Sequence, residues 1–287
     1  MSRDVLTVPH KCNLEETHSG IDTLARCQNP DHFRNYPWPV AYNYNSRGYR
    51  DAEWPSDIKD LRSSVWCVGD SFTVGLGQPF DHIWPQILSK RINIPTINVS
   101  RDGASNGAIA DNVRSIIKWC EPARIVVMWS YLHRRIDNIF DDPNMPRWKQ
   151  WYDRIQQPGW PDCNSIAEFQ ALSQDLQSAV IHVIGEETYR RELTQTQHYV
   201  RSTNENDIED FAHWVQDVEL NKGHTHIVHS VIPEFCPVKW TDRAMAVIEP
   251  YDHVPHTPKL DLARDGHHFD RATAEWVVEQ VVPLLRL

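Results

Sequence analysis

The stretch Val65-Trp66-Cys67-Val68-Gly69-Asp70-Ser71-Phe72-Thr73 decides how the rest of the chain can be arranged. Four apolar residues in a row predict a buried strand of a parallel sheet, and the Gly-Asp-Ser that follows predicts a sharp turn where this strand ends. Open α/β sheets bind their ligands at the carboxyl ends of the strands. The hydroxyl of Ser71 is therefore a candidate for chemistry, although the tripeptide taken alone favours a serine that only caps a turn.

Strands and helices alternate along the chain after this turn. We expect a helix over residues 81–88, with Asp81 as its N-cap and Pro85 in its first turn. A closing amphipathic helix can be capped by Asp270. Further buried strands are predicted over residues 96–100, 124–130 and 225–232, and a helix over 108–119. This alternation predicts a parallel, doubly wound sheet.

Composition and charge exclude several classes of function. The chain has 287 residues, enough to bury a sizeable core, and a formal net charge of −10 at pH 7. The negative charge argues against nucleic acid or an anionic membrane as the main partner. The sequence shows no apolar run of membrane-spanning length and no secretion signal, so we expect a cytoplasmic or otherwise non-secreted protein. The six cysteines lack the spacing of a disulfide framework, which favours reduced thiols.

The first part of the chain, residues 1–64, is rich in Pro, Asn, Asp and aromatic residues and has no sustained periodicity. We expect it to wrap around the domain formed by residues 65–287 and not to fold alone. Within it, the turn-like segment 44–51 predicts a positive φ at Gly48.

Four side chains of this N-terminal extension could bind a soft metal ion: His10, Cys12, Cys27 and His32. Structural zinc sites usually contain closer pairs such as Cys-x2-Cys. We therefore favour packing or loop roles for these residues, and we expect neither a metal nor another cofactor.

A long insert over about residues 134–222 interrupts the alternation, with helices expected over 165–185 and 186–220. Because it follows the carboxyl end of a strand, it can cover a site as a lid or substrate wall. A helical layer without contact to substrate is the alternative. Four tryptophans in the insert would suit a sugar ring: Trp148, Trp151, Trp160 and Trp214.

Asp265 and His268 stand three residues apart, just before the closing helix. A serine becomes a good nucleophile only when a neighbouring base takes its proton, and the base needs an acid to hold its tautomer. One tight turn can present this carboxylate and this imidazole side by side, with the second ring nitrogen facing Ser71. Alone, the spacing is weak and a capping role for Asp265 is the simpler interpretation.

In combination, these motifs resemble those of the SGNH (GDSL-type) hydrolases. The resemblance is carried by Gly69-Asp70-Ser71-Phe72-Thr73-Val74-Gly75, by Gly103 after the second strand and by Asp265-Gly266-His267-His268. It extends to the order of elements over residues 65–131 and 224–286. The segment 45–51 is similar to a stretch that precedes the first motif in many longer members.

The resemblance implies a flavodoxin-like, three-layer α/β/α fold and the hydrolysis of esters or acyl groups. Carried over by position, Ser71 is the nucleophile, His268 the base and Asp265 the acid that orients it. The backbone N–H groups of Ser71 and Gly103 would stabilise the oxyanion.

One motif departs from the family pattern. The family places an asparagine at the end of the third strand to complete the oxyanion hole, whereas residues 129–135 contain none. Removing one such donor typically costs about 10²–10³ in rate. The substitutes that we consider are Ser130, Asn106 and Arg134, and for Arg134 a solvated helix start is the alternative. Our candidates for contacting the substrate are Asp70, Trp129 and Arg134.

The sequence therefore predicts a serine esterase that works through an acyl-enzyme, on a small-molecule or glycan ester, with deacetylation of a glycan as the first hypothesis. An acyltransferase of the same fold is an alternative. A non-catalytic binding module that keeps the fold is another.

Overall fold

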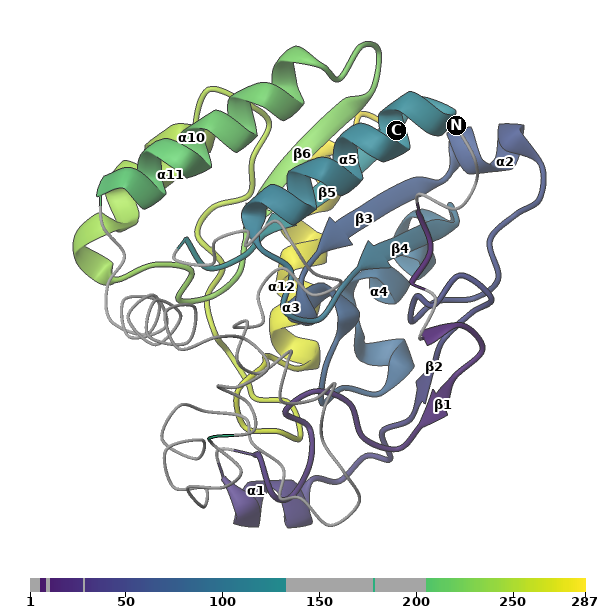
Figure 1. The fold of residues 1–287 in the computed structure, drawn as a ribbon, viewed down its shortest axis with the longest axis vertical. Coiled ribbons are helices and arrows are strands. Elements are labelled where there is room, and N and C mark those ends of the chain that lie inside the picture. Colours follow the sequence, from purple (N-terminus) through teal and green to yellow (C-terminus); the bar gives the residue numbers. More distant parts are fainter. Residues whose placement is uncertain (1–5, 9–10, 28, 133–177, 179–204) are drawn as a thin grey trace.

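A computed structural model of the protein describes residues 6–8, 11–27, 29–132, 178 and 205–287 (Figure 1). At its centre is a parallel sheet with strand order β4-β3-β5-β6, built from β3 (Val65–Gly69), β4 (Thr96–Ser100), β5 (Arg124–Trp129) and β6 (His226–Val231). All five residues of β3 are buried, as their unbroken apolar run predicts. Within the described ranges, the helices lack the length and apolarity needed to cross a membrane.

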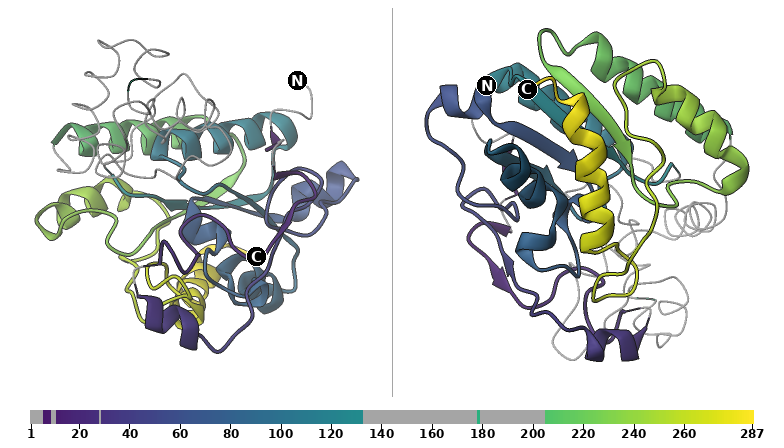
Figure 2. Two further views of the ribbon diagram at one scale, coloured as in Figure 1. Left: turned by 60° about the horizontal axis from the view of Figure 1, so that its bottom comes forward. Right: turned by 180° about the vertical axis from the view of Figure 1, so that it is seen from behind.

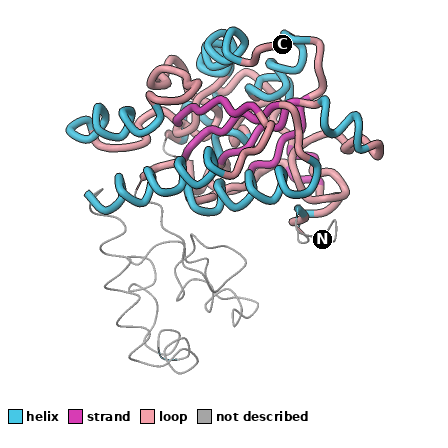
Figure 3. The backbone as a smooth tube through the Cα atoms, turned by 90° about the horizontal axis from the view of Figure 1, so that it is seen from above, coloured by secondary structure: helices cyan, strands magenta, loops and turns pink. Residues whose placement is uncertain are grey.

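Helices cover both faces of this sheet (Figure 2). On one face lie α5 (Asn106–Cys120) and α10 (Glu205–Leu220), and on the other lie α4 (Trp84–Ile92) and α12 (Arg271–Val281). Figure 3 shows the strands between these helices. The predicted three-layer α/β/α arrangement with a flavodoxin-like strand order is thereby confirmed.

The described end of the predicted insert belongs to one of these layers. Helix α10 packs against α5 and against α11 (Thr241–Ile248). Its residues Phe211, Val215 and Val218 are buried in the main core. Of the insert's four tryptophans, Trp214 packs against that core, and Trp148, Trp151 and Trp160 lie outside the described residues.

The first helix after β3 begins earlier in the sequence than predicted. Helix α3 (Ser71–Val74) begins directly after β3, because the Asp70 carboxylate accepts a hydrogen bond from the Phe72 N–H (3.0 Å) and caps it. The expected cap, Asp81, lies instead in the short 3₁₀ turn Phe80–His82. Helix α4 then starts at Trp84 without a side-chain cap, with Pro85 in its first turn as predicted.

The closing helix α12 is also capped by another residue than predicted. Asp270 precedes it, but its side chain makes no capping bond. The carboxylate of Asp261 accepts the Ala272 N–H (2.6 Å) and the Thr273 N–H (3.1 Å) in its place. The Asp270 carboxylate is turned away because it accepts a hydrogen bond from the Tyr36 hydroxyl (2.5 Å).

The N-terminal extension is more ordered than its sequence predicts. It contains the antiparallel pair β1 (Glu15–Glu16) and β2 (Tyr42–Asn43) and the helices α1 (Pro30–Asn35) and α2 (Ile58–Ser63). The predicted positive φ of Gly48 is confirmed, at 81°. The buried side chains of Val40 and Tyr42 form a small cluster with Val74 and Leu76, which follow Ser71. The extension therefore packs onto the segment after the predicted nucleophile.

The extension also contains a buried carboxyl group, Asp51, which is 8 % exposed. Burial raises its pKa to about 7 although it accepts N–H bonds, among them one from Asn98 N (2.8 Å). Because the folded-state pKa is above the ordinary 3.8, the folded protein binds the proton more tightly than the unfolded chain. Stability from this group is present at low pH and is lost as the pH rises from about 4 to 7.

We expect Asp51→Asn to remove this pH dependence, since the Gln86 amide that contacts Asp51 can turn its oxygen toward the new amide. Between pH 5 and pH 8 the wild type should lose roughly 2 kcal/mol more unfolding free energy than the variant. Urea denaturation of both proteins at the two pH values measures this. Parallel losses in the two proteins would contradict it.

Candidate active site

Ser71 lies where the strand order of the sheet reverses. It follows β3, whose neighbours are β4 on one side and β5 on the other. The crevice at such a switch point, outside the carboxyl ends of the strands, is the usual ligand site of doubly wound sheets. Ser71 is the first residue of α3, so its backbone N–H points out of the helix without an intrahelical acceptor.

A tight turn before α12 brings an acid and a base to this position. One oxygen of the Asp265 carboxylate accepts the backbone N–H groups of His267 (2.8 Å) and His268 (2.9 Å). Its other oxygen lies 2.5 Å from Nδ1 of His268. Nε2 of His268 lies 2.8 Å from Oγ of Ser71. The structure therefore brings Ser71, His268 and Asp265 into one continuous chain of hydrogen bonds.

The surroundings of Asp265 determine which nitrogen of His268 carries the proton. Burial by itself would raise the pKa of Asp265, but the charge and hydrogen bond of His268 and the two N–H donors outweigh it, and the pKa is lowered. Asp265 is thus a carboxylate at neutral pH. It accepts the proton of Nδ1 and leaves Nε2 free to accept the hydroxyl proton of Ser71.

Aromatic side chains hold the imidazole in place. The ring of Phe72 packs against His268 at 4.5 Å and against Phe269 at 5.4 Å between centroids. The three polar residues are almost completely buried, with exposures of 1 % for Ser71, 2 % for His268 and 0 % for Asp265. Low polarity around them strengthens the electrostatic interactions in the chain.

Two of the proposed oxyanion donors have other partners. The Ser130 hydroxyl donates to the buried carboxylate of Asp70 (2.6 Å). The Asn106 side chain accepts the Ser130 N–H (2.7 Å) and donates to the Ser130 carbonyl (3.2 Å). Asn106 and Ser130 therefore fasten the start of α5 to the end of β5, and a role of either side chain as an oxyanion donor stays a prediction. Gly103 lies in the turn after β4, as expected.

Two of the candidates for contacting the substrate are buried and have hydrogen-bond partners within the protein. Asp70 is fully buried and bonded to Phe72 and Ser130. Trp129 is also fully buried, and its indole N–H donates to Nδ1 of His229 (3.0 Å). The carboxylate caps α3 and the indole faces the core, and contact of either side chain with a substrate stays a prediction. Arg134 lies outside the described residues.

A half-buried pair that the sequence did not predict, Tyr131 and His267, lies beside the imidazole of His268. The Tyr131 hydroxyl lies 3.2 Å from Nε2 of His267, and the His267 ring meets the His268 ring edge to face at 4.9 Å. The rings of Tyr131 and His267 also contact the ring of Phe72. The only signal in the sequence was an aromatic residue directly after the third strand.

The candidate metal ligands contact main-chain carbonyls. Cys12 and Cys27 donate to Val8 and Leu24, and Nε2 of His32 donates to Ala263 (2.8 Å). The fourth candidate, His10, lies outside the described residues. Among the residues that the structure describes, no group of three or more His, Cys, Asp or Glu side chains could hold a metal ion.

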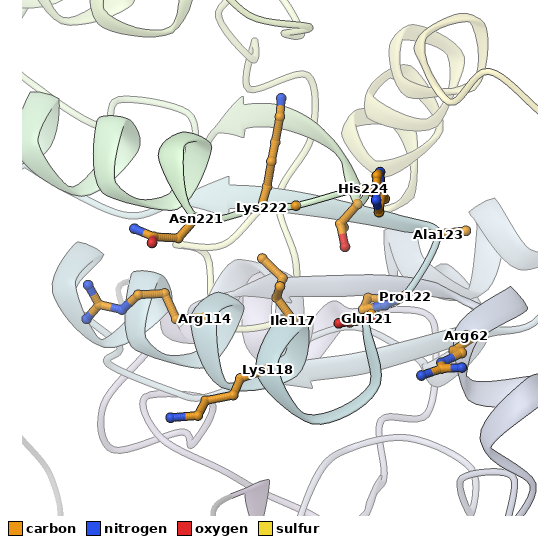
Figure 4. A pocket seen from close by; sticks show the side chains of 12 residues that line it. Arg62, Arg114, Ile117, Lys118, Glu121, Pro122, Ala123, Asn221, Lys222 and His224 are labelled. Carbon is orange, nitrogen blue, oxygen red and sulfur yellow. The ribbon is translucent and has the colours of Figure 1, made fainter.

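A cavity of about 670 Å³ lies at the opposite, amino end of the sheet (Figure 4). Arg62 and Arg114 lie at its two ends, and each already has partners. Arg62 donates to the Cys120 carbonyl at the end of α5 (2.8 Å), and Arg114 pairs with Asp217 of α10. These cations offset negative groups near the ends of two helices, so we place no chemistry there.

Comparison with known proteins gives similarities of fold alone. No family model matches the sequence, and no curated protein does. Among solved structures, the chain is similar to TesA, with 14 % identity, a TM-score of 0.43 and coverage of 78 % of this chain and 98 % of that one. It is also similar to a GDSL-like lipase from Bacteroides thetaiotaomicron, with 11 % identity, a TM-score of 0.41 and coverage of 81 % and 91 %. A third is a family two carbohydrate esterase from Clostridium thermocellum in complex with cellohexaose, with 11 % identity, a TM-score of 0.42 and coverage of 81 % and 65 %.

Replacing each of the two adjacent histidines tests which of them acts on Ser71. His268→Ala should lower kcat/KM toward an activated ester by several orders of magnitude, because only Nε2 of His268 contacts the hydroxyl. His267→Ala is the matched control and should cost far less. Steady-state kinetics with p-nitrophenyl acetate measure both, and equal losses or the reverse order would contradict the assignment.

Ser130→Ala tests the role of the third strand's end. We expect a loss of about 1–3 kcal/mol in unfolding free energy, because the buried Asp70 carboxylate loses a donor. We expect kcat to change less than about tenfold, since the hydroxyl points to Asp70. A fall of about 10² or more in kcat with unchanged KM would identify Ser130 as an oxyanion donor.

Proposed function

We propose that the protein is a serine ester hydrolase with Ser71 as nucleophile, His268 as general base and Asp265 as the acid that orients it. The observation that supports this most strongly is the hydrogen-bond chain from Asp265 through His268 to Ser71, with distances of 2.5 and 2.8 Å. Nucleophilic catalysis needs a charged acid, an imidazole protonated on Nδ1 and a hydroxyl that donates to Nε2, and these distances support the proposal because they suit those three states.

The reaction has two halves. Oγ of Ser71 attacks the ester carbonyl carbon while its proton passes to Nε2 of His268. His268 then protonates the leaving alcohol, and the acyl group stays on Ser71. In the second half His268 takes a proton from water, the water oxygen attacks the acyl carbon, and the carboxylic acid leaves as Ser71 regains its proton.

We propose that the oxyanion hole consists of two backbone donors, the N–H groups of Ser71 and Gly103. The Ser71 N–H is available because it starts α3. Side-chain donors from Ser130 and Asn106 are excluded from this proposal by their partners in the structure. A hole with one donor fewer is expected to catalyse more slowly, by about 10²–10³.

The substrate in this proposal is a carboxylic ester, and an acetylated glycan is the first hypothesis for it. The tryptophans that suggested a sugar lie mainly outside the described residues, so this choice depends on the sequence. An acyltransferase would use the same first half and replace water by another alcohol in the second. Adding an acetyl-accepting sugar to the assay and looking for the transferred ester separates the two.

Labelling with a fluorophosphonate tests the proposed nucleophile. Wild-type protein should gain the mass of one phosphonyl group and lose its p-nitrophenyl acetate hydrolysis, because only a hydroxyl activated by a base reacts quickly. Ser71→Ala should do neither, which intact-mass spectrometry shows. A wild type without adduct or hydrolysis would favour the non-catalytic binding module, and an adduct on Ser71→Ala would assign the nucleophile to another residue.

A further inference from the structure

Two loops that carry the proposed catalytic groups touch each other directly. Gly77, in the loop after Ser71, has a φ of 74°, and its carbonyl accepts the Arg264 N–H (2.9 Å). A Cβ added at Gly77 would lie 2.9 Å from Cβ of Ala263 and 3.1 Å from the nitrogens of Arg264 and Asp265. The relative position of the two loops therefore sets the distance between Ser71 and His268.

A single carboxylate from the N-terminal extension is bonded to one loop directly and to the other through Tyr42. Asp22 is completely buried. It accepts Nε (2.9 Å) and Nη2 (2.5 Å) of Arg264, the residue directly before Asp265. It also accepts the Tyr42 hydroxyl (2.5 Å), whose oxygen in turn accepts the Gly77 N–H (2.8 Å).

Further hydrogen bonds join the extension to each of the two loops. On the loop before α12, the Tyr36 hydroxyl binds Asp270 (2.5 Å) and His32 binds the Ala263 carbonyl (2.8 Å). On the loop after Ser71, the buried guanidinium of Arg50 donates to the carbonyls of Gly75 (2.5 Å) and Gln78 (2.7 Å). The extension is thus bonded to both sides of the Ser71–His268 contact.

We propose that the N-terminal extension is a positioning clamp for the active site, with Asp22 as its central residue. The inference rests on the proposed function, because it concerns the alignment of a nucleophile with its base. Arg264 is covalently joined to Asp265, so its bidentate pairing with Asp22 fixes the backbone from which the acid projects. Misplacement of reacting groups by about 1 Å can cost about 10² in rate.

The central test is Asp22→Asn, which removes the charge that holds Arg264 and keeps the size of the side chain. Per site titrated with the fluorophosphonate, kcat for p-nitrophenyl acetate should fall about 10- to 100-fold while KM changes less than about threefold. The acid limb of the kcat/KM profile should move to lower pH, because a poorly aligned Asp265 stabilises the imidazolium less. A residue that only stabilises the fold would lower the melting temperature and leave kcat per titrated site and the pH profile unchanged.

Asp51→Asn is the matched control. Asp51 is also a buried carboxyl group of the extension, but its side-chain partners Asn98 and Gln86 belong to β4 and α4. Its kcat and pH profile should equal those of the wild type. If Asp22→Asn does not fold, Tyr42→Phe decides, since it removes only the hydroxyl between Asp22 and Gly77 and should also lower kcat without raising KM.

A second measurement separates failure of the clamp from failure of the proposed function. A wild type that is neither labelled nor active refutes the esterase. The proton between Asp265 and His268, seen far downfield in the ¹H NMR spectrum, can be measured in either case. Its loss or shift in Asp22→Asn but not in Asp51→Asn supports the clamp, and an unchanged signal in folded Asp22→Asn overturns it.

Discussion

The contact between His268 and Ser71 joins side chains that are 197 residues apart in the chain. The sheet fixes only one of the two partners, because Ser71 follows β3 directly while His268 lies in a turn beyond the last strand. Contacts outside the sheet therefore position the turn that contains His268 next to Ser71. The backbone contact between Gly77 and Arg264, the Phe72 ring against the imidazole and the bonds from Asp22 all act on this one distance.

The strands could be predicted because burial leaves a local signal. Each strand of the parallel sheet is covered on both faces, so it appears as a short apolar run with a turn at its end. Helix caps could not be predicted equally well. Asp81 and Asp270 stood at suitable positions in the sequence, but Asp70 and Asp261 have the carboxylates that reach the free N–H groups. Which carboxylate caps a helix depends on the path of the backbone before that helix, and this path has no local signal in the sequence.

The polar chain of the site could be predicted only from several motifs in combination, because the spacing of Asp265 and His268 alone also fits a capping role for Asp265. The hydrogen bonds of the side chains around it could not be predicted. Ser130 and Asn106 stood close to the expected oxyanion position, but each satisfies a buried group of a neighbouring element, Asp70 in one case and the end of β5 in the other. Buried hydrogen-bonding groups have to be paired, and such pairings between distant segments have no periodicity in the sequence.

The bond from Asp22 to Arg264 also orders events during synthesis. The two residues are 242 positions apart, and the described side chains of the extension pack partly with Val74 and Leu76 and partly into the main core. At about 5–20 residues per second, the ribosome needs roughly 10 to 50 seconds between them. During that time Asp22 has no Arg264 to bind, so this bond can form only once the loop before α12 has been synthesised.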